Sequence, residues 1–260
     1  MRAVLLDLDE TLIHEHAATS AALRATLSDA CALRALDLEV CAAAVLAGAR
    51  RLWAAGPHAP YCQRIGISSH EGLWASFALG DDAHTVGLRG FAPAYRRAAW
   101  AMGLKVAGVE DQDLCAELAE RYVGERSRRQ WPFAEAAGVL CTLRARGLRI
   151  VVLTNGDRDL QRRKLVACGL LPLVDAVVIS GVFGRGKPEP DVFAHALRQA
   201  ESDAPDAVMV GDSAERDVAG ACAAGLRAVW LRRGRGGPSA AGAWAECEDL
   251  SRLPGLLEGV

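Results

Sequence analysis

The sequence predicts an α/β protein built on a parallel β-sheet, with an all-helical segment inserted after the first strand. An almost unbroken apolar run over residues 1–6 leads directly into Asp7 and Asp9. From Trp131 onward, short apolar runs alternate with helical patterns, which is typical of βαβ units. Residues 14–130, between these two parts, show helical spacing and no convincing strand.

Length and composition are consistent with one large core, or one core and a smaller second domain. The chain has 260 residues, 51% of them hydrophobic, so global disorder is not expected. Its net charge of −2 gives no reason to expect nucleic acid or an anionic membrane as a partner. We find no signal peptide, no apolar run long enough to span a bilayer, and no CxxC spacing among the eight cysteines. We therefore expect a cytoplasmic protein with reduced thiols, as a monomer or homodimer.

The first strand is predicted to be buried on both faces and to end at two carboxylates. Because burying an unpaired carboxylate is costly, Asp7 and Asp9 are expected just past the carboxyl end of the strand. Side chains alternate along a strand, so these two point the same way while Leu8 faces the core. Ligands of open α/β sheets bind at this edge. Two carboxylates there indicate a divalent cation, a nucleophile with an acid/base, or both.

The inserted segment is rich in alanine and leucine and is predicted to form several helices. Its features are a helical pattern over 17–52 with breaks at Asp37 and Gly48, a loop at 56–60, an ambiguous region at 65–90, and helices at 91–100 and 108–129. Trp53, Trp74 and Trp100 are expected in its core. Because the segment leaves the sheet beside the two carboxylates, it can cover them as a cap.

The part after Trp131 supplies the rest of the sheet. Its predicted elements are helices at 133–146, 160–168, 187–200 and 215–224, and strands at 148–153, 176–179, 207–210 and 227–231. Right-handed crossovers put the carboxyl ends of such strands on one edge. Polar residues follow four strands there: Asp7 and Asp9, Thr154 and Asn155, residues 180–187, and Asp212. We therefore predict a Rossmann-like parallel sheet core of residues 1–14 and 131–260, which is catalytic, and a helical cap domain of residues 15–130.

Four segments at these strand ends resemble the motifs of a known family. They are Asp7–Thr11 (DLDET), Leu153–Gly156 (LTNG), Gly186–Pro190 (GKPEP) and Gly211–Asp217 (GDSAERD). In this order they resemble the four motifs of the haloacid dehalogenase superfamily. More closely, they look like its phosphatases that carry a helical cap between the first and second motifs. One such motif alone would be weak, whereas four in order, each at a predicted strand end, are specific.

The resemblance implies a magnesium-dependent phosphatase that acts on a small phosphorylated metabolite through an aspartyl-phosphate. Asp7 would be the nucleophile, and Asp9 the general acid and then the general base. Thr154 and the backbone N–H of Asn155 would bind a phosphoryl oxygen. Lys187 would neutralise charge on Asp7 and on the phosphate.

Mg²⁺ is the expected cofactor, since two carboxylates would repel a phosphate dianion unless a cation intervened. The family pattern implies Asp7, Asp212 and the backbone carbonyl of Asp9 as ligands. Asp217 would reach the metal through water or support its ligands. Thr11 would support the turn toward the cap.

Alternatives stay open at this point. A metal-independent haloacid dehalogenase uses an aspartate to attack carbon, but the dehalogenases that resemble this chain generally lack the second aspartate, so Asp9 argues against it. A phosphomutase acting on a phosphosugar would need a cap that favours the sugar over water. A non-enzymatic phosphate- or metal-binding module is a further alternative. Asp212 could merely cap a helix, and Asp217 could be a carboxylate on a helix surface.

Overall fold

The computed structural model describes residues 1–234 and 238–258, which form two compact units. The sheet unit comprises Met1–Glu15, Trp131–Gly156 and the described residues from Gln161 onward. The helical unit comprises His16–Gln130 and the short segment Asp157–Leu160. A catalytic role for the sheet unit and a covering role for the helical unit stay predictions.

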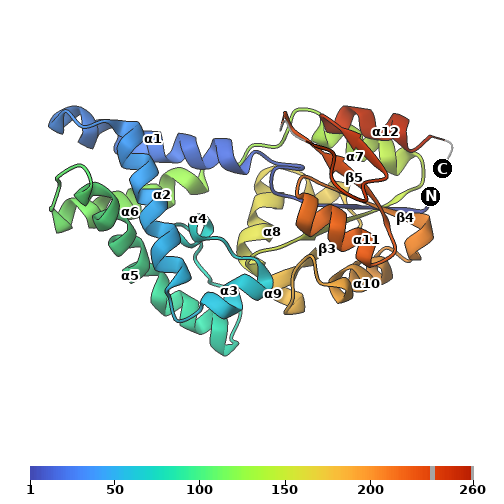
Figure 1. The fold of residues 1–260 in the computed structure, drawn as a ribbon, viewed down its shortest axis with the longest axis horizontal. Helices are drawn as coiled ribbons and strands as arrows, with labels where there is room; N and C mark the ends of the chain where they lie inside the picture. Colours follow the sequence, from blue (N-terminus) through green and yellow to red (C-terminus); the bar gives the residue numbers. More distant parts are fainter. Residues whose placement is uncertain (235–237, 259–260) are drawn as a thin grey trace. The chain divides into compact units, whose positions relative to one another are not determined.

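The sheet unit is built on a six-stranded parallel sheet of order β3-β2-β1-β4-β5-β6. The strands are β1 (Ala3–Leu6), β2 (Arg149–Thr154), β3 (Ala176–Ile179), β4 (Ala207–Gly211), β5 (Arg227–Leu231) and β6 (Ala245–Cys247). The α/β fold with a parallel sheet is therefore confirmed. The first strand, β1, lies at the centre and pairs with β2 and β4 (Figure 1). The edge strand β6 was not expected from the sequence.

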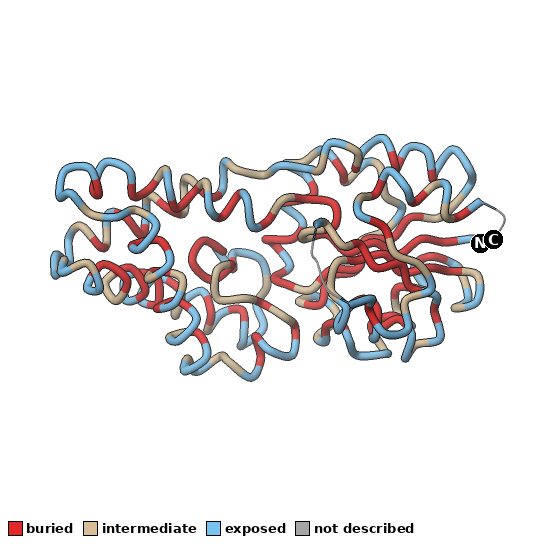
Figure 2. The backbone as a smooth tube through the Cα atoms, turned by 45° about the horizontal axis from the view of Figure 1, so that its top comes forward, coloured by how far each residue is buried: buried red, intermediate tan, exposed pale blue. Residues whose placement is uncertain are grey.

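Helices cover both faces of the sheet, because each central strand is apolar on both sides. Val4 and Leu6 share an apolar cluster with Leu140 and Leu253 on one face, whereas Ala3 and Leu5 share another with Phe193 and Ala221. The helices of this unit are α7 (Ala136–Ala145), α8 (Arg158–Ala167, whose first residues belong to the helical unit), α9 (Ser180–Phe183), α10 (Pro190–Gln199), α11 (Gly220–Ala223) and α12 (Leu253–Leu256). Short helical turns are η1 (Leu171–Leu173), η2 (Ala204–Asp206), η3 (Ala214–Ala219, a π-helix) and η4 (Leu250–Arg252). The strands β1 and β4 are buried along their whole length, and most of the other strand residues are buried or half-buried (Figure 2).

The helical unit contains no strand within the described residues 16–130. Its helices are α1 (Glu15–Arg34), α2 (Leu38–Ala54), α3 (Ala59–Ile65), α4 (Ser69–Gly72), α5 (Ala83–Lys105) and α6 (Gln112–Ser127). The expected break at Asp37 is confirmed, because α1 ends at Arg34 and α2 begins directly after Asp37. The Asp37 carboxylate accepts the Val40 N–H at 3.0 Å and so caps the start of α2. The expected break at Gly48 is wrong. Gly48 lies inside α2, where a Cβ would meet the Ala99 carbonyl oxygen of α5 at 3.3 Å.

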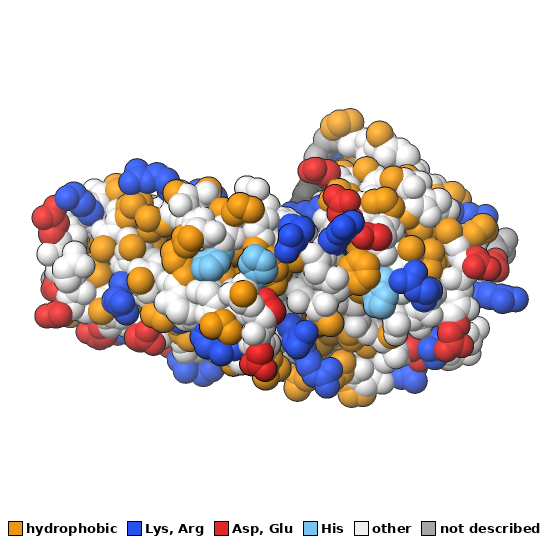
Figure 3. All heavy atoms as spheres, turned by 90° about the horizontal axis from the view of Figure 1, so that it is seen from below, with side chains coloured by type: hydrophobic (Ala, Val, Ile, Leu, Met, Phe, Trp, Pro, Cys, Tyr) orange, Lys and Arg blue, Asp and Glu red, His pale blue; other side chains and the backbone are white. Residues whose placement is uncertain are grey.

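The three expected core tryptophans of the helical unit, Trp53, Trp74 and Trp100, are all buried. Along the described part of the chain, no helix combines the length and the apolar character that a bilayer crossing requires. On the face drawn in Figure 3, acidic and basic side chains are interspersed with apolar and neutral ones. This mixture accords with the small net charge of −2.

Candidate active site

Asp7 and Asp9 follow β1 directly, and Leu8 between them is fully buried in the core. The Asp7 N–H donates to the Val210 carbonyl at 3.0 Å, which continues the pairing of β1 with β4. The Thr11 hydroxyl lies 3.3 Å from Asp7 Oδ2 and donates to it. Asp7 is therefore held at the predicted edge of the sheet by its own backbone N–H, which bonds to β4, and by the Thr11 hydroxyl, which bonds to its carboxylate.

Lys187 joins two buried carboxylates. Its Nζ lies 2.6 Å from Asp7 Oδ1 and 2.7 Å from Asp217 Oδ1. Burial raises the pKa of Asp7, although Lys187 opposes this effect. Burial works to lower the pKa of Lys187, but the charges of Asp217 and Asp7 outweigh it and raise the pKa. Lys187 thus lies as a charged ammonium group between the Asp7 and Asp217 carboxylates. Its predicted role of neutralising Asp7 and the phosphate stays a prediction.

Asn155 ties the loop after β2 to the loop that carries Lys187. Its Nδ2 donates to the Lys187 carbonyl at 2.9 Å, and its Oδ1 accepts the Lys187 N–H at 2.8 Å. A Cβ on Gly186 would lie 2.7 Å from Asn155 Oδ1, so this position requires glycine. The expected contribution of the Asn155 backbone N–H to phosphate binding stays a prediction. The role of its side chain was not foreseen.

Asp7, Asp212 and Asp217 form an acidic cluster, with one carboxylate oxygen from each lying within 4.8 Å of the others. Asp212 is not a helix cap, because Ser213 caps η3 by accepting the Arg216 N–H at 3.1 Å. Asp217 is not a surface carboxylate either, since it is buried and its Oδ2 accepts the Ser213 N–H at 3.0 Å. Three carboxylates are hard oxygen donors of the kind that Mg²⁺ prefers, so the cluster fits that ion.

Asp9 and Thr154 share contacts with a residue that was not predicted, Gln161 of α8. Gln161 Nε2 donates to Asp9 Oδ2 at 2.8 Å and to Thr154 Oγ1 at 2.7 Å. On the same face of α8, Lys164 Nζ lies 2.9 Å from Asp9 Oδ1 and 3.2 Å from Glu15 Oε2. Gln161, Lys164 and Glu15 are all buried.

A signal for these residues exists in the helical pattern of α8. Gln161 follows Leu160 and Lys164 precedes Leu165, and both leucines are fully buried. Residues three apart lie on the same face of a helix. Two polar residues on an apolar face therefore point toward the core, where each needs a polar partner. The order of the sequence alone could not identify Asp9 as that partner.

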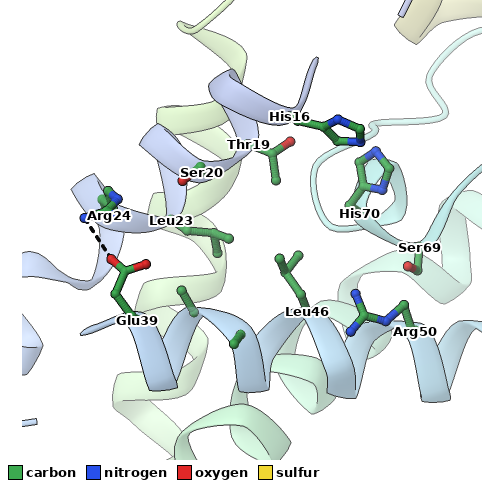
Figure 4. Close-up of a pocket in the computed structure, with 12 residues that line it drawn as sticks. His16, Thr19, Ser20, Leu23, Arg24, Glu39, Leu46, Arg50, Ser69 and His70 are labelled. Atoms are coloured by element: carbon green, nitrogen blue, oxygen red, sulfur yellow. Dashed lines mark ion pairs between the residues drawn. The ribbon is translucent and has the colours of Figure 1, made fainter. Parts of the chain in front are cut away.

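The helical unit has a separate pocket of about 410 Å³, lined by α1, α2 and the start of α4 (Figure 4). Leu23 and Leu46 point into the space, and His16 and His70 lie near one another at one end. At the other end Arg24 and Glu39 form an ion pair of 2.8 Å. The pocket contains none of the site residues expected from the sequence.

A comparison against known families assigns the chain to one of them. Residues 1–225 match the haloacid dehalogenase-like hydrolase family. The chain belongs to this family. The resemblance seen in the four motifs is therefore confirmed, and the match spans the helical insertion and the strands β1 to β4.

The comparisons with individual proteins find a phosphatase, a dehalogenase and a hydrolase of similar fold. The chain is 39% identical over 236 residues to the phosphoserine phosphatase of Thermus thermophilus, and the match covers 90% of each protein. Among solved structures, the HAD-hydrolase YfnB of Bacillus subtilis has a TM-score of 0.68 at 21% identity, covering 99% of this chain and 98% of that one. A 2-haloacid dehalogenase of Pseudomonas syringae has a TM-score of 0.60 at 28% identity, covering 99% and 98%. The chain is an enzyme, a phosphoric monoester hydrolase of the haloacid dehalogenase type.

Proposed function

We propose that this enzyme is a magnesium-dependent phosphatase that hydrolyses a small phosphorylated metabolite through an aspartyl-phosphate on Asp7. The observation that carries the proposal is the buried contact of Lys187 with Asp7 and Asp217, beside the Asp212 carboxylate. This arrangement offers a nucleophile, a fixed positive charge and oxygen donors for a cation at one point. Those are the parts that transfer of a dianionic phosphoryl group requires.

In the first step, an Asp7 carboxylate oxygen attacks phosphorus and the bond to the leaving oxygen breaks. Asp9 gives a proton to that oxygen, so an alcohol departs. In the second step, Asp9 takes a proton from water, the water oxygen bonds to phosphorus, and the bond to Asp7 breaks. Thr154 and the Asn155 N–H hold the phosphoryl oxygens, while Lys187 balances their charge.

Mg²⁺ would be held by the side chains of Asp7 and Asp212 and by the Asp9 backbone carbonyl. Asp217 would support this set through its buried carboxylate. The ion supplies charge neutralisation that lets an anionic nucleophile approach an anionic phosphate. Lys187 would add a second positive charge beside the nucleophile, since its Nζ contacts both Asp7 and Asp217.

Phosphoserine is the first candidate substrate. The relative from Thermus thermophilus is named for that ester, and the match extends along nine-tenths of both chains. A small phosphate ester is thus the expected partner. The cytoplasmic location and the oligomeric state stay predictions.

Two other reactions remain to be compared with this one. The likeness to a 2-haloacid dehalogenase favours carbon–halogen cleavage as a second candidate. Asp9 argues against it, because attack on carbon needs no second carboxylate to move a proton. A phosphomutase would use the same two aspartates but return the phosphoryl group to a sugar.

The test is phosphate release from phosphoserine, phosphoglycolate, sugar phosphates, nucleotides and p-nitrophenyl phosphate, with Mg²⁺ and with EDTA. We expect release that requires Mg²⁺. Asp7→Asn is expected to fall below about 10⁻⁴ of wild-type activity with its circular dichroism unchanged. Asp203→Asn, an exposed carboxylate of the same unit, is the matched control.

Retained turnover in pure Asp7→Asn would contradict the nucleophile assignment. Release of halide from 2-chloropropionate without metal would favour a dehalogenase. An isomerised phosphosugar in place of free phosphate would favour a mutase.

A further inference from the structure

The Asp9 carboxylate is held from α8 by two side chains, one on each oxygen. Gln161 Nε2 donates to Oδ2 at 2.8 Å and Lys164 Nζ to Oδ1 at 2.9 Å. We propose that Gln161 and Lys164 are positioning residues that fix the plane of the Asp9 carboxylate for proton transfer, with Glu15 holding Lys164 in place. This inference rests on the proposed function, in which Asp9 is the acid and base.

A donor on each oxygen restrains rotation about the Cβ–Cγ bond of Asp9. A carboxylate has about four acceptor positions, so two donors set its orientation without using all of them. The Asp9 side chain keeps 24% of its surface exposed, whereas that of Lys164 is fully buried. The restraint therefore comes from the buried side of Asp9 and leaves the accessible side for the leaving oxygen or for water.

Gln161 also links the acid/base to phosphate binding. Its second N–H donates to Thr154 Oγ1 at 2.7 Å. Because the Thr154 oxygen accepts this bond, its own hydroxyl hydrogen is directed elsewhere and donates to the Asn155 carbonyl at a long 3.3 Å. Donation to a phosphoryl oxygen would replace that weak bond. One amide group thus fixes the positions of the Asp9 carboxylate and the Thr154 hydroxyl relative to each other.

The backbone makes room for this amide. A Cβ on Gly156 would lie 2.9 Å from both Cγ and Cδ of Gln161, and Gly156 has a φ of 140° that disfavours other residues. The Gln161 Oε1 atom has no hydrogen-bond partner among the described residues. A buried carbonyl without a partner lowers stability, so the side chain is a poor choice for packing alone. Its N–H groups account for its presence.

Lys164 lies between two carboxylates, Asp9 and Glu15, at 2.9 and 3.2 Å. A lysine at this point keeps Glu15 and Asp9 from repelling each other in a buried site. Removal of Lys164 alone would leave that repulsion, so Lys164→Met is paired with Glu15→Gln in a neutral double variant. Gln161→Leu removes both N–H donors with no change in charge, and it is the decisive variant.

The experiment compares two esters in rapid-mixing assays with Mg²⁺: an alkyl phosphate and p-nitrophenyl phosphate. An alkoxide is a strong base and needs a proton from Asp9 as it leaves, whereas nitrophenolate leaves without one. In Gln161→Leu we expect phosphoryl transfer from the alkyl ester to slow about 10²-fold. Transfer from the nitrophenyl ester should slow far less, because it loses only the support of Thr154 and needs no proton from Asp9. It should give a burst of one nitrophenol per enzyme, followed by slow turnover. The double variant Lys164→Met/Glu15→Gln is expected to slow transfer from the alkyl ester in the same way as Gln161→Leu.

Arg162→Ala is the matched control, since Arg162 is an exposed residue of α8 beside Gln161. It should match wild type on both esters. Equal slowing of both transfer steps in Gln161→Leu, a reduced burst amplitude, or no slowing at all would overturn the inference. The proposed function fails separately, if wild-type enzyme with Mg²⁺ releases phosphate from neither ester. Should the double variant not fold, Gln161→Leu decides alone.

Discussion

Asp157 is a buried carboxyl group that has no part in the proposed chemistry. It is 4% exposed, and its Oδ1 accepts the Leu160 N–H at 3.0 Å near the start of α8. Burial raises its pKa to about 6 from an ordinary value of 3.8. Near neutral pH the folded protein therefore carries an ionised group that would be more stable in water.

Asp157→Asn is expected to stabilise the protein near neutral pH. Asparagine caps as well as aspartate but carries no charge to bury. Because the folded-state pKa lies above the unfolded one, wild-type stability falls as pH rises from about 4 through about 6. The variant should gain up to about 3 kcal/mol in free energy of unfolding at about pH 7, and the gain should vanish below about pH 4.

Urea unfolding at both pH values measures this effect. Asp81→Asn, at an exposed position of the helical unit, should change little at either pH. A gain that persists unchanged in acid would show that the carboxyl charge is not its cause.

At the scale of single residues, sequence predicted the groups that end a strand. Asp7, Thr154 and Asp212 each follow an apolar run, and their proximity follows from parallel strands. Gln161 and Lys164 were missed because polar residues on a helix usually face solvent. Only the folded sheet unit shows that these two contact Asp9.

At the scale of elements, α2 and α5 approach each other closely at a glycine. A Cβ on Gly103 would lie 2.6 Å from both N and Cα of Val45, backbone atoms that cannot move aside. Gly103→Ala should therefore lower the free energy of unfolding of the helical unit by about 1–3 kcal/mol.

Gly90→Ala, in the same helix α5, is the matched contrast. Gly90 is exposed, and nothing lies within 4 Å of its added Cβ. Alanine favours helix over glycine, so this variant should gain up to about 1 kcal/mol. Thermal and urea unfolding of both variants measure the two effects. If both changes had the same sign, close packing would not be the reason for Gly103.

Element boundaries were predictable where apolar runs and caps agree. Residues 176–179 and 227–231 form β3 and β5 as expected, and Asp37 caps α2. The predicted break at Gly48 was wrong because a glycine is found both where a helix ends and where two helices pack closely together. The predicted helix at 215–224 is instead a π-helix followed by α11. The short edge strand β6 has too few apolar residues to show a strand pattern.

At the scale of the whole molecule, Mg²⁺ should stabilise the fold by binding the folded state alone. Asp7 lies far in sequence from Asp212 and Asp217, and the three carboxylates come together only when the sheet forms. At a concentration of about 100 times its Kd, the ion would add about 2.7 kcal/mol. Calorimetry with Mg²⁺ and with EDTA should show a higher Tm with the ion.

Asp212→Asn should lose most of this shift, because one of three carboxylates in the cluster becomes neutral. Asp203→Asn, which lies outside the cluster, should keep it. An equal shift in both variants would place the ion elsewhere. This measurement needs no substrate, so it tests metal binding apart from catalysis.

The architecture was more predictable than the topology. Alternation of strands and helices fixes a parallel sheet, and a long helical stretch after the first strand indicates an insertion. The order of strands does not follow from local pattern, because it depends on which apolar faces pack together. The central place of β1 was therefore learned from the structure.

That central place has a consequence for folding during synthesis. β1 is made first, but its neighbours are residues 149–154 and 207–211. At about 5–20 residues per second, roughly 10–40 s pass on the ribosome between β1 and β4. Residues 16–130 are complete before either neighbour exists, so their helices can pack while β1 still has two unpaired edges. The nascent chain thus carries a strand prone to wrong pairing for most of its synthesis, a period in which chaperones would be most needed.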